Sequence, residues 1–200
     1  MQYPRSKILT AFFTATALSL AGCNSGNDGG LIGTSSGTGS IQVRVALKFA
    51  GTYSTTCELE EPADPEFNFA GSYAISQITL GETSGTTRTY YYTDDECTQP
   101  NSPAEGMVEF SLVYPGGTQE TQQGKADFVD VTVQSVTVDG QRITDDDSIE
   151  LADDVFDTQY HIRLVDGDLL YLSGEGEGEF DGTTEERRFN TLDEIPLMRQ

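Results

Sequence analysis

The chain has 200 residues, of which 33 are Asp or Glu and 11 are Lys or Arg, so its formal net charge is −22. A surface this acidic repels the phosphates of DNA and RNA, which argues against nucleic-acid binding. We interpret the charge as a source of solubility, with a cationic partner or bound cations as the alternative.

Residues 1–22 have the three parts of a secretory signal. Arg5 and Lys7 supply the positive start, an apolar run extends from Ile8 to Leu20, and small residues then precede Cys23. The run of about 13 residues is too short for a helix that spans a bilayer, which needs roughly 20. The pattern predicts that the chain is exported.

The end of this leader, Leu20-Ala21-Gly22-Cys23, resembles the lipobox of bacterial lipoproteins. The resemblance implies cleavage before Cys23, a diacylglycerol on its sulfur and an acyl chain on its new amine, and therefore attachment to the membrane through an N-terminal lipid. The next residue is Asn24. In that family an Asp at this position retains the protein in the inner membrane, so we expect this protein to lie in the outer membrane of the cell envelope. An ordinary secreted protein, with Cys23 incidental, is the alternative.

The residues after the leader divide into a linker and one domain. Residues 23–40 consist of the acylated cysteine and a stretch rich in Gly, Ser and Thr, which has too few apolar side chains to become ordered. Residues 41–200 form a single domain that is long enough to bury a core of its own.

Apolar and polar residues alternate along several segments of this domain, as in half-buried strands. The first runs from Ile41 to Phe49. Further strands are expected at residues 73–80, 86–93, 108–114 and 128–133. Two Asp-Gly pairs, at 139–140 and 166–167, each lie between strand-like segments and are typical of type I′ hairpin turns.

The second hairpin would place Leu164 opposite Leu169 and Ile162 opposite Tyr171, which gives one apolar face. Residues 174–179 form either a charged edge strand or a loop, residues 185–192 a last strand, and residues 148–157 one short helix. About eight to ten strands joined mainly by short turns predict an all-β antiparallel fold, either a barrel or a sandwich.

Two cysteines, Cys57 and Cys97, remain once Cys23 is assigned to the lipid. A disulfide is the default for such a pair in an exported protein. A metal site is the alternative, but the chain has no C-x-x-C motif and His161 is its only histidine.

The surroundings of these cysteines resemble the adenomatosis-polyposis-coli-down-regulated-type domain over about residues 49–100. The segments 51–58 and 90–100 follow its pattern G-x-W…C-E…Y…Y-x-D-x-x-C…P, with Tyr53 at the Trp position. The resemblance implies a lipocalin-like barrel, a Cys57–Cys97 bridge and binding of an acyl chain or another apolar ligand. It implies no catalysis.

Alternation combined with this resemblance selects candidate walls of an apolar cavity, which are Val43, Val45, Leu47, Phe110, Leu112, Ile162 and Tyr171. A solid core would alternate in the same way. The sequence therefore predicts a non-enzymatic binding module for a small apolar molecule, or alternatively an envelope structural or interaction protein with a filled barrel.

Catalytic and metal sites have weaker support in the sequence. The lone His161 lies within a predicted strand, and a catalytic triad would need it. The acidic groups at residues 94–96 and 145–157 could hold Ca²⁺, but the spacing of the second group does not fit an EF-hand. We interpret both groups as solvated loops and predict no metal and no cofactor.

Overall fold

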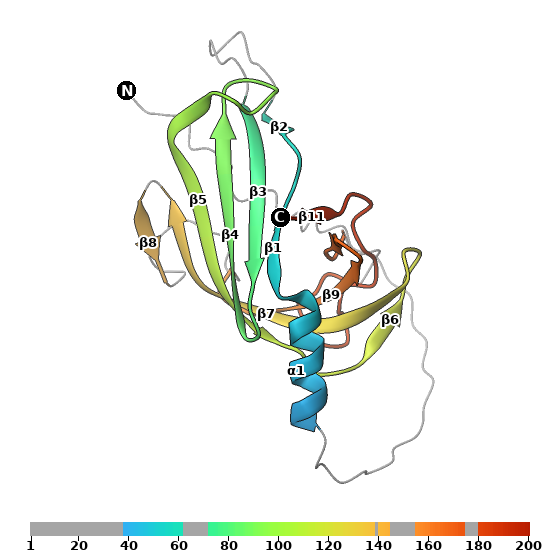
Figure 1. Cartoon of the computed structure of the whole chain (residues 1–200). Coiled ribbons are helices and arrows are strands. Elements are labelled where there is room, and N and C mark those ends of the chain that lie inside the picture. Colours follow the sequence, from blue (N-terminus) through green and yellow to red (C-terminus); the bar gives the residue numbers. More distant parts are fainter. Residues whose placement is uncertain (1–37, 62–71, 139, 145–154, 175–179) are drawn as a thin grey trace, which may run out of the picture.

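The computed structural model of the chain describes residues 38–61, 72–138, 140–144, 155–174 and 180–200 (Figure 1). The elements are α1 (Thr38–Phe49), β1 (Gly51–Ser54), β2 (Glu58–Glu61), β3 (Ser72–Leu80), β4 (Ser84–Tyr92), β5 (Pro100–Val113), β6 (Thr118–Glu120), β7 (Lys125–Val138), β8 (Gln141–Ile143), β9 (Thr158–Asp166), β10 (Leu169–Tyr171) and β11 (Leu197–Arg199).

Eight of these strands close into an antiparallel barrel, which confirms the predicted fold class. Their order around the barrel is β1, β3, β4, β5, β7, β9, β10 and β11, and β11 returns to β1. Tyr53 of β1 lies at the junction, opposite Ile78 of β3 on one side and Arg199 of β11 on the other. The short strands β2, β6 and β8 extend β3 and β7 beyond the closed part.

The segment predicted as the first strand, residues 41–49, is instead most of helix α1, which begins within the predicted linker. The side chains packed against the barrel are Val45, Ala46 and Phe49, whose spacing is helical. Val43 and Leu47 are 46% and 53% exposed, whereas a strand would place them on the same face as Val45 and Phe49. A nine-residue alternating run is short enough to serve either structure, and packing against the barrel decides between them.

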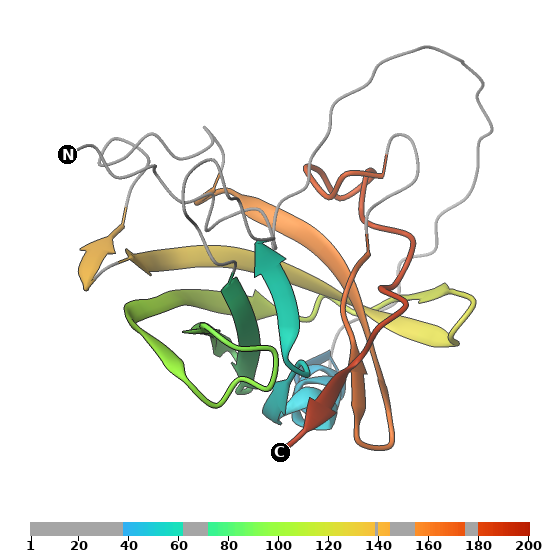
Figure 2. The same cartoon turned by 90° about the horizontal axis from the view of Figure 1, so that it is seen from above.

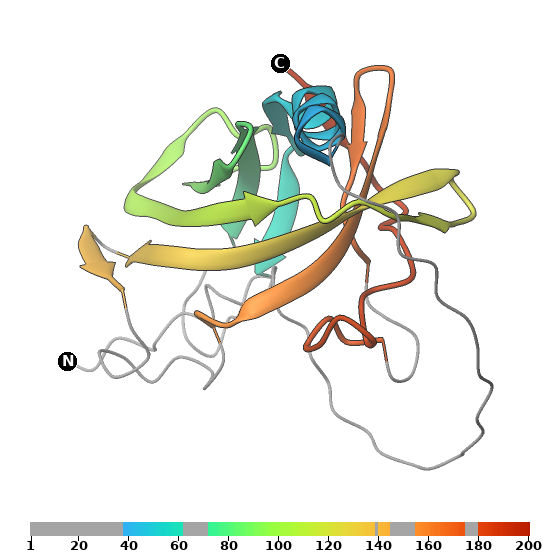
Figure 3. The same cartoon turned by 90° about the horizontal axis from the view of Figure 1, so that it is seen from below.

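Helix α1 covers one end of the barrel. Figures 2 and 3, which view the molecule from opposite directions, both show the helix end-on beside β1 and the β9–β10 hairpin. The buried cluster at this end joins the helix to the barrel wall, and its members are Ala46, Phe49, Tyr53, Ile78, Leu80, Phe110, Leu112, Tyr114, Val129, Leu170 and Leu197.

The first predicted hairpin is confirmed and the second is displaced. Val138 pairs with Gln141 around Gly140, whose φ is 77°. In the second hairpin Leu164 pairs with Tyr171, and the loop is Gly167-Asp168 rather than Asp166-Gly167. In the observed loop Gly167 is the first residue and has a positive φ. The predicted turn would require a positive φ at Asp166 as well as at Gly167.

Several other boundaries differ from the sequence prediction. The segments 128–133 and 135–138 belong to one strand, β7, with an irregularity opposite Glu109 and Phe110. Residues 185–192 form turns and a single bridge between Ser173 and Leu192, while β1, β2, β6 and β11 were not predicted. The candidate helix at 148–157 and the possible strand at 174–179 lie mostly outside the described residues.

Candidate functional site

The two faces of β7 and β9 separate the interior of the barrel from its outer surface. Val129 belongs to the interior cluster, and Phe128, the next residue, packs on the opposite face of the sheet. Ile162 pairs with Phe128 and lies in the same outer cluster as Tyr171. The prediction that Ile162 and Tyr171 line the interior is therefore wrong.

This outer face is apolar because the C-terminal segment covers it. Ile162, Leu164 and Tyr171 pack there with Leu192, which lies outside the strands. Alternation identified the shared face of these residues correctly. It could not show which face is inside, since a covered outer face and an interior have the same composition.

The remaining candidate wall residues divide between the interior and the solvent. Phe110 and Leu112 of β5 are buried in the interior cluster, and Val45 of α1 packs against it. Val43 and Leu47 lie on the exposed side of α1 and therefore do not line the interior. The ring of Phe110 lies across Gly85, where an added Cβ would come within 2.5 Å of it.

A charged side chain, Arg163 of β9, is buried within this interior and is only 5% exposed. Its register partner on β7 is Asp127, and its guanidinium carbon lies 5.9 Å from the centre of the Phe110 ring. The Nε and Nη1 atoms have no hydrogen-bond partner. Burial lowers the pKa of Arg163, although a guanidinium keeps its proton in proteins.

Tyr114 is 4% exposed, and its hydroxyl is a second buried polar group without a hydrogen-bond partner. The Tyr114 ring stacks on Phe49 of α1, with ring centres 5.6 Å apart. Burial raises the pKa of Tyr114, and the nearby positive charge of Arg163 opposes that rise. The two groups lie close enough that a hydrogen bond between them also lowers the pKa of Tyr114 and raises that of Arg163, although the contact is not well aligned and leaves the Tyr114 hydroxyl and Nε and Nη1 of Arg163 unsatisfied.

The acidic and basic neighbours of Arg163 are engaged elsewhere or neutral. The carboxylate of Asp127 accepts a hydrogen bond from Lys48 Nζ of α1 at 2.8 Å. His161, two residues before Arg163 on β9, lies against Phe189 with ring centres 5.0 Å apart. Burial, together with the charges of Arg163 and Arg188, lowers the pKa of His161 to about 3, so its imidazole is neutral near pH 7.

The interior face of β3 carries smaller side chains towards the end of the barrel opposite α1. Along β3, Ile78 and Leu80 belong to the interior cluster, and Ser76, Ala74 and Ser72 continue the same face away from the helix. Thr89 of β4 pairs with Ser76 and so faces the same way. Small and hydroxyl-bearing side chains thus line β3 in this half, while Tyr91, which pairs with Ala74, and the apolar cluster of Val133, Val136 and Val155, against which Val108 packs, are buried in the same half from other parts of the chain.

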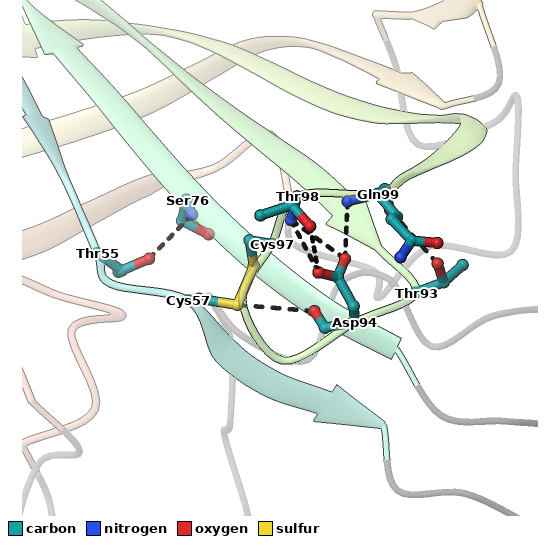
Figure 4. Close-up of a disulfide and its surroundings, with 8 residues drawn as sticks. All are labelled: Thr55, Cys57, Ser76, Thr93, Asp94, Cys97, Thr98 and Gln99. Carbon is teal, nitrogen blue, oxygen red and sulfur yellow. Dashed lines mark hydrogen bonds between the residues drawn. A yellow bond between two sulfur atoms is a disulfide. The ribbon is translucent and has the colours of Figure 1, made fainter.

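The predicted disulfide joins Cys57 and Cys97 at this far end (Figure 4). Cys57 lies in the break between β1 and β2, and Cys97 lies in the loop between β4 and β5. Their Cα atoms are 5.8 Å apart, within the usual range for a disulfide. The bond fixes the β4–β5 loop to the edge of the barrel.

The carboxylate of Asp94 organises the same loop. It accepts hydrogen bonds from Thr98 Oγ1 and Gln99 N at 2.7 Å each, and from Thr98 N at 3.1 Å. These bonds, chiefly the one from the Thr98 hydroxyl, lower the pKa of Asp94. Among the described residues, no group of three or more His, Cys, Asp or Glu side chains is placed to hold a metal ion.

The sequence analysis missed Arg188, which attaches the C-terminal segment to the outer face. Its side chain is 6% exposed and donates hydrogen bonds to the carbonyl oxygens of Val129 and His161 at 3.1 and 3.0 Å. Its Nη2 lies 2.7 Å from Asp130 Oδ1, although not in hydrogen-bond geometry. No local motif marks this role, because the acceptors come from strands far away in the sequence.

The sequence analysis also missed the burial of Arg163. This residue lies between Ile162 and Leu164, on a strand face that also carries Gln159, His161 and Val165. This mixture of polar and apolar residues does not show that the face is buried.

In the part of the chain that the structure describes, no helix has the length and apolar character needed to cross a bilayer. No known protein family matches the chain, and no curated protein is significantly similar to it.

Proposed function

We propose that this chain is a lipid-anchored protein of the bacterial cell envelope whose barrel binds a small apolar molecule without catalysing a reaction. The anchor is Cys23, held by its acyl chains in the outer membrane. The leader and its lipobox support this location. The resemblance of residues 49–100 to the adenomatosis-polyposis-coli-down-regulated-type domain supports a lipocalin-like role.

The observation that carries the binding proposal is the pair of unpartnered polar groups, Arg163 and Tyr114, enclosed among apolar side chains. Each buried polar group without a partner costs about 1–3 kcal/mol, and more when the group is charged. A barrel interior with only a structural role would be more stable with apolar residues there. An eight-stranded barrel can be filled by side chains or can hold one small ligand, and these groups favour the ligand.

A filled barrel with a structural or interaction role is the second candidate. It is favoured by the packing next to α1, where Phe49 stacks on Tyr114 and both belong to one buried cluster. In this case the interior holds no small molecule, and any partner would bind outside the barrel.

The substitution Leu112→Trp separates the two candidates, because Leu112 is buried in the interior. In a barrel with room for a ligand, the larger ring lowers the affinity for a fluorescent fatty acid and changes stability little. In a filled barrel the added volume costs about 1–3 kcal/mol. Val113→Trp is the matched control, since Val113 is the next residue and is exposed.

Native mass spectrometry of the protein purified from its own membrane provides a direct test of binding, because a retained ligand adds its mass. Absence of any bound molecule, together with no binding of apolar probes and easy unfolding of Leu112→Trp, would reject the binding function in favour of the filled barrel. The anchor is tested separately with Cys23→Ser. Full membrane retention of a mature-sized, unacylated variant would contradict acylation at Cys23.

A further inference from the structure

We propose that the ligand of the barrel carries an anionic group, of the carboxylate type, and that Arg163 and Tyr114 bind this group inside the barrel. The inference rests on the proposed binding function and specifies the chemical class of the ligand, which is an amphiphilic acid with an apolar body.

The donors available to such a group come from two strands of the barrel. Nε of Arg163 carries one N–H and Nη1 carries two, and none of them has an acceptor. The hydroxyl of Tyr114, the residue that follows β5, adds a fourth donor. A carboxylate offers two oxygens that can accept several such bonds, and charge-assisted bonds of this kind are the strongest that proteins make.

A negative charge is required because the enclosed group is a cation. Among the described residues, no carboxylate lies within ion-pair distance of Arg163, and Asp127 across the strand is already paired with Lys48. The neutral imidazole of His161 supplies no charge. A neutral ligand could accept hydrogen bonds but would leave the buried positive charge unbalanced, which is costly in a poorly polar interior.

The apolar part of the ligand is specified by the side chains beside the guanidinium. The face of Phe110 lies next to Arg163, and both Phe110 and Tyr114 belong to the interior apolar cluster. Because α1 covers the near end, the ligand body would extend towards the far end, where Tyr91, Val108 and Val133 also face the interior. The anion would then lie deepest and the apolar body nearer the entrance.

The test compares two probes that share one apolar chain, cis-parinaric acid and its methyl ester, on the whole acylated protein. We expect the unmodified protein to bind the acid at least tenfold more tightly than the ester. Arg163→Met should remove this preference, because it should lower the affinity for the acid at least tenfold and leave the affinity for the ester unchanged. Tyr114→Phe, which removes only the hydroxyl, should lower the affinity for the acid several-fold.

Arg44→Met is the control for loss of a positive charge, because Arg44 lies on the exposed side of α1, and it should leave the preference intact. Equal affinities of the unmodified protein for acid and ester would overturn the inference and leave the binding function standing. Equal losses of affinity for the two probes in Arg163→Met would also overturn it. If neither probe binds the unmodified protein, the inference and the proposed function both fail.

Discussion

Arg199 in the last strand donates a hydrogen bond to the hydroxyl of Tyr53 in the first strand, and its guanidinium carbon lies 4.9 Å from the centre of the Tyr53 ring. The same hydroxyl donates to the carbonyl oxygen of Phe49, at the end of α1, at 3.1 Å. One fully buried aromatic side chain therefore joins the helix to both strands at the seam of the barrel.

Truncation of this side chain should be among the most damaging single changes in the protein. We expect Tyr53→Ala to lower the free energy of unfolding by about 3–5 kcal/mol, because it leaves a large cavity at the seam. Tyr53→Phe keeps the ring and loses two hydrogen bonds, which should cost about 1–3 kcal/mol. Urea denaturation of the oxidised protein measures both values, and equal costs would contradict a dominant role for the ring.

The architecture was predictable from sequence where local rules act alone. Strands β3 and β4, and the hairpin around Gly140, follow from alternation and turn chemistry, and Cys57 and Cys97 paired as expected. The failures have a common cause. Whether residues 41–49 form a strand or a helix, and which face of β9 is inside, depends on what packs against them from distant parts of the chain.

The candidate site was less predictable than the fold. Phe110 and Leu112 lie in the interior as expected, but they do not by themselves specify a ligand. The polar pair on which the ligand proposal rests, Arg163 and Tyr114, is brought together because β7 pairs with β5 on one side and with β9 on the other. Sequence alone places Arg163 on a strand face with His161 and Val165, and it cannot show that the side chain is buried or that its donors lack acceptors.

The helical assignment of α1 predicts which of its residues tolerate a charge. Ala46→Asp should destabilise the protein by several kcal/mol, roughly 3 or more, because it buries a carboxylate at a position that is 3% exposed. Leu47→Asp, the next residue, should change stability by about 0.5 kcal/mol or less because Leu47 faces solvent. Thermal unfolding of the two variants provides the comparison. The reverse order would indicate a strand.

Removal of the disulfide should destabilise the folded protein without changing the barrel. For a loop of about 41 residues, the chain-entropy relation gives roughly 4 kcal/mol. We expect Cys57→Ala with Cys97→Ala to lose about this much in guanidinium denaturation and to keep its far-ultraviolet circular dichroism. Free thiols at both positions in protein prepared with a thiol-blocking reagent would contradict the bond itself.

Arg188 and its neighbour Arg187 form a matched pair for testing the cover on the outer face. Arg188→Met should cost about 3 kcal/mol, since it removes two buried hydrogen bonds and the ion partner of Asp130. Arg187→Met removes an exposed ion pair with Asp181 and should cost less than about 1 kcal/mol. Limited proteolysis should show faster cleavage within residues 180–196 of Arg188→Met, and similar rates in both variants would exclude this anchoring role.

The single histidine gives an unambiguous prediction of pH dependence. The folded pKa of His161 is about 3 and its ordinary value is 6.5, so the unfolded chain takes up a proton first as the pH falls. The contribution of His161 to stability is therefore present above pH 6.5 and declines below it, by up to about 1.4 kcal/mol per pH unit. The imidazole protons in a nuclear magnetic resonance titration should not shift between pH 8 and pH 5 while the protein stays folded.

The variant His161→Gln should lose this dependence between pH 6.5 and 4.5. Below that range the carboxylates with lowered pKa values, Asp94, Glu109 and Asp181, also favour unfolding as the pH falls, so the comparison is made above it. Stability measured by urea denaturation should fall more steeply with acid in the unmodified protein than in the variant. Parallel curves, or an imidazole that titrates near pH 6.5 in the folded protein, would mean that solvent reaches His161 and that the interior beside Arg163 is open to water.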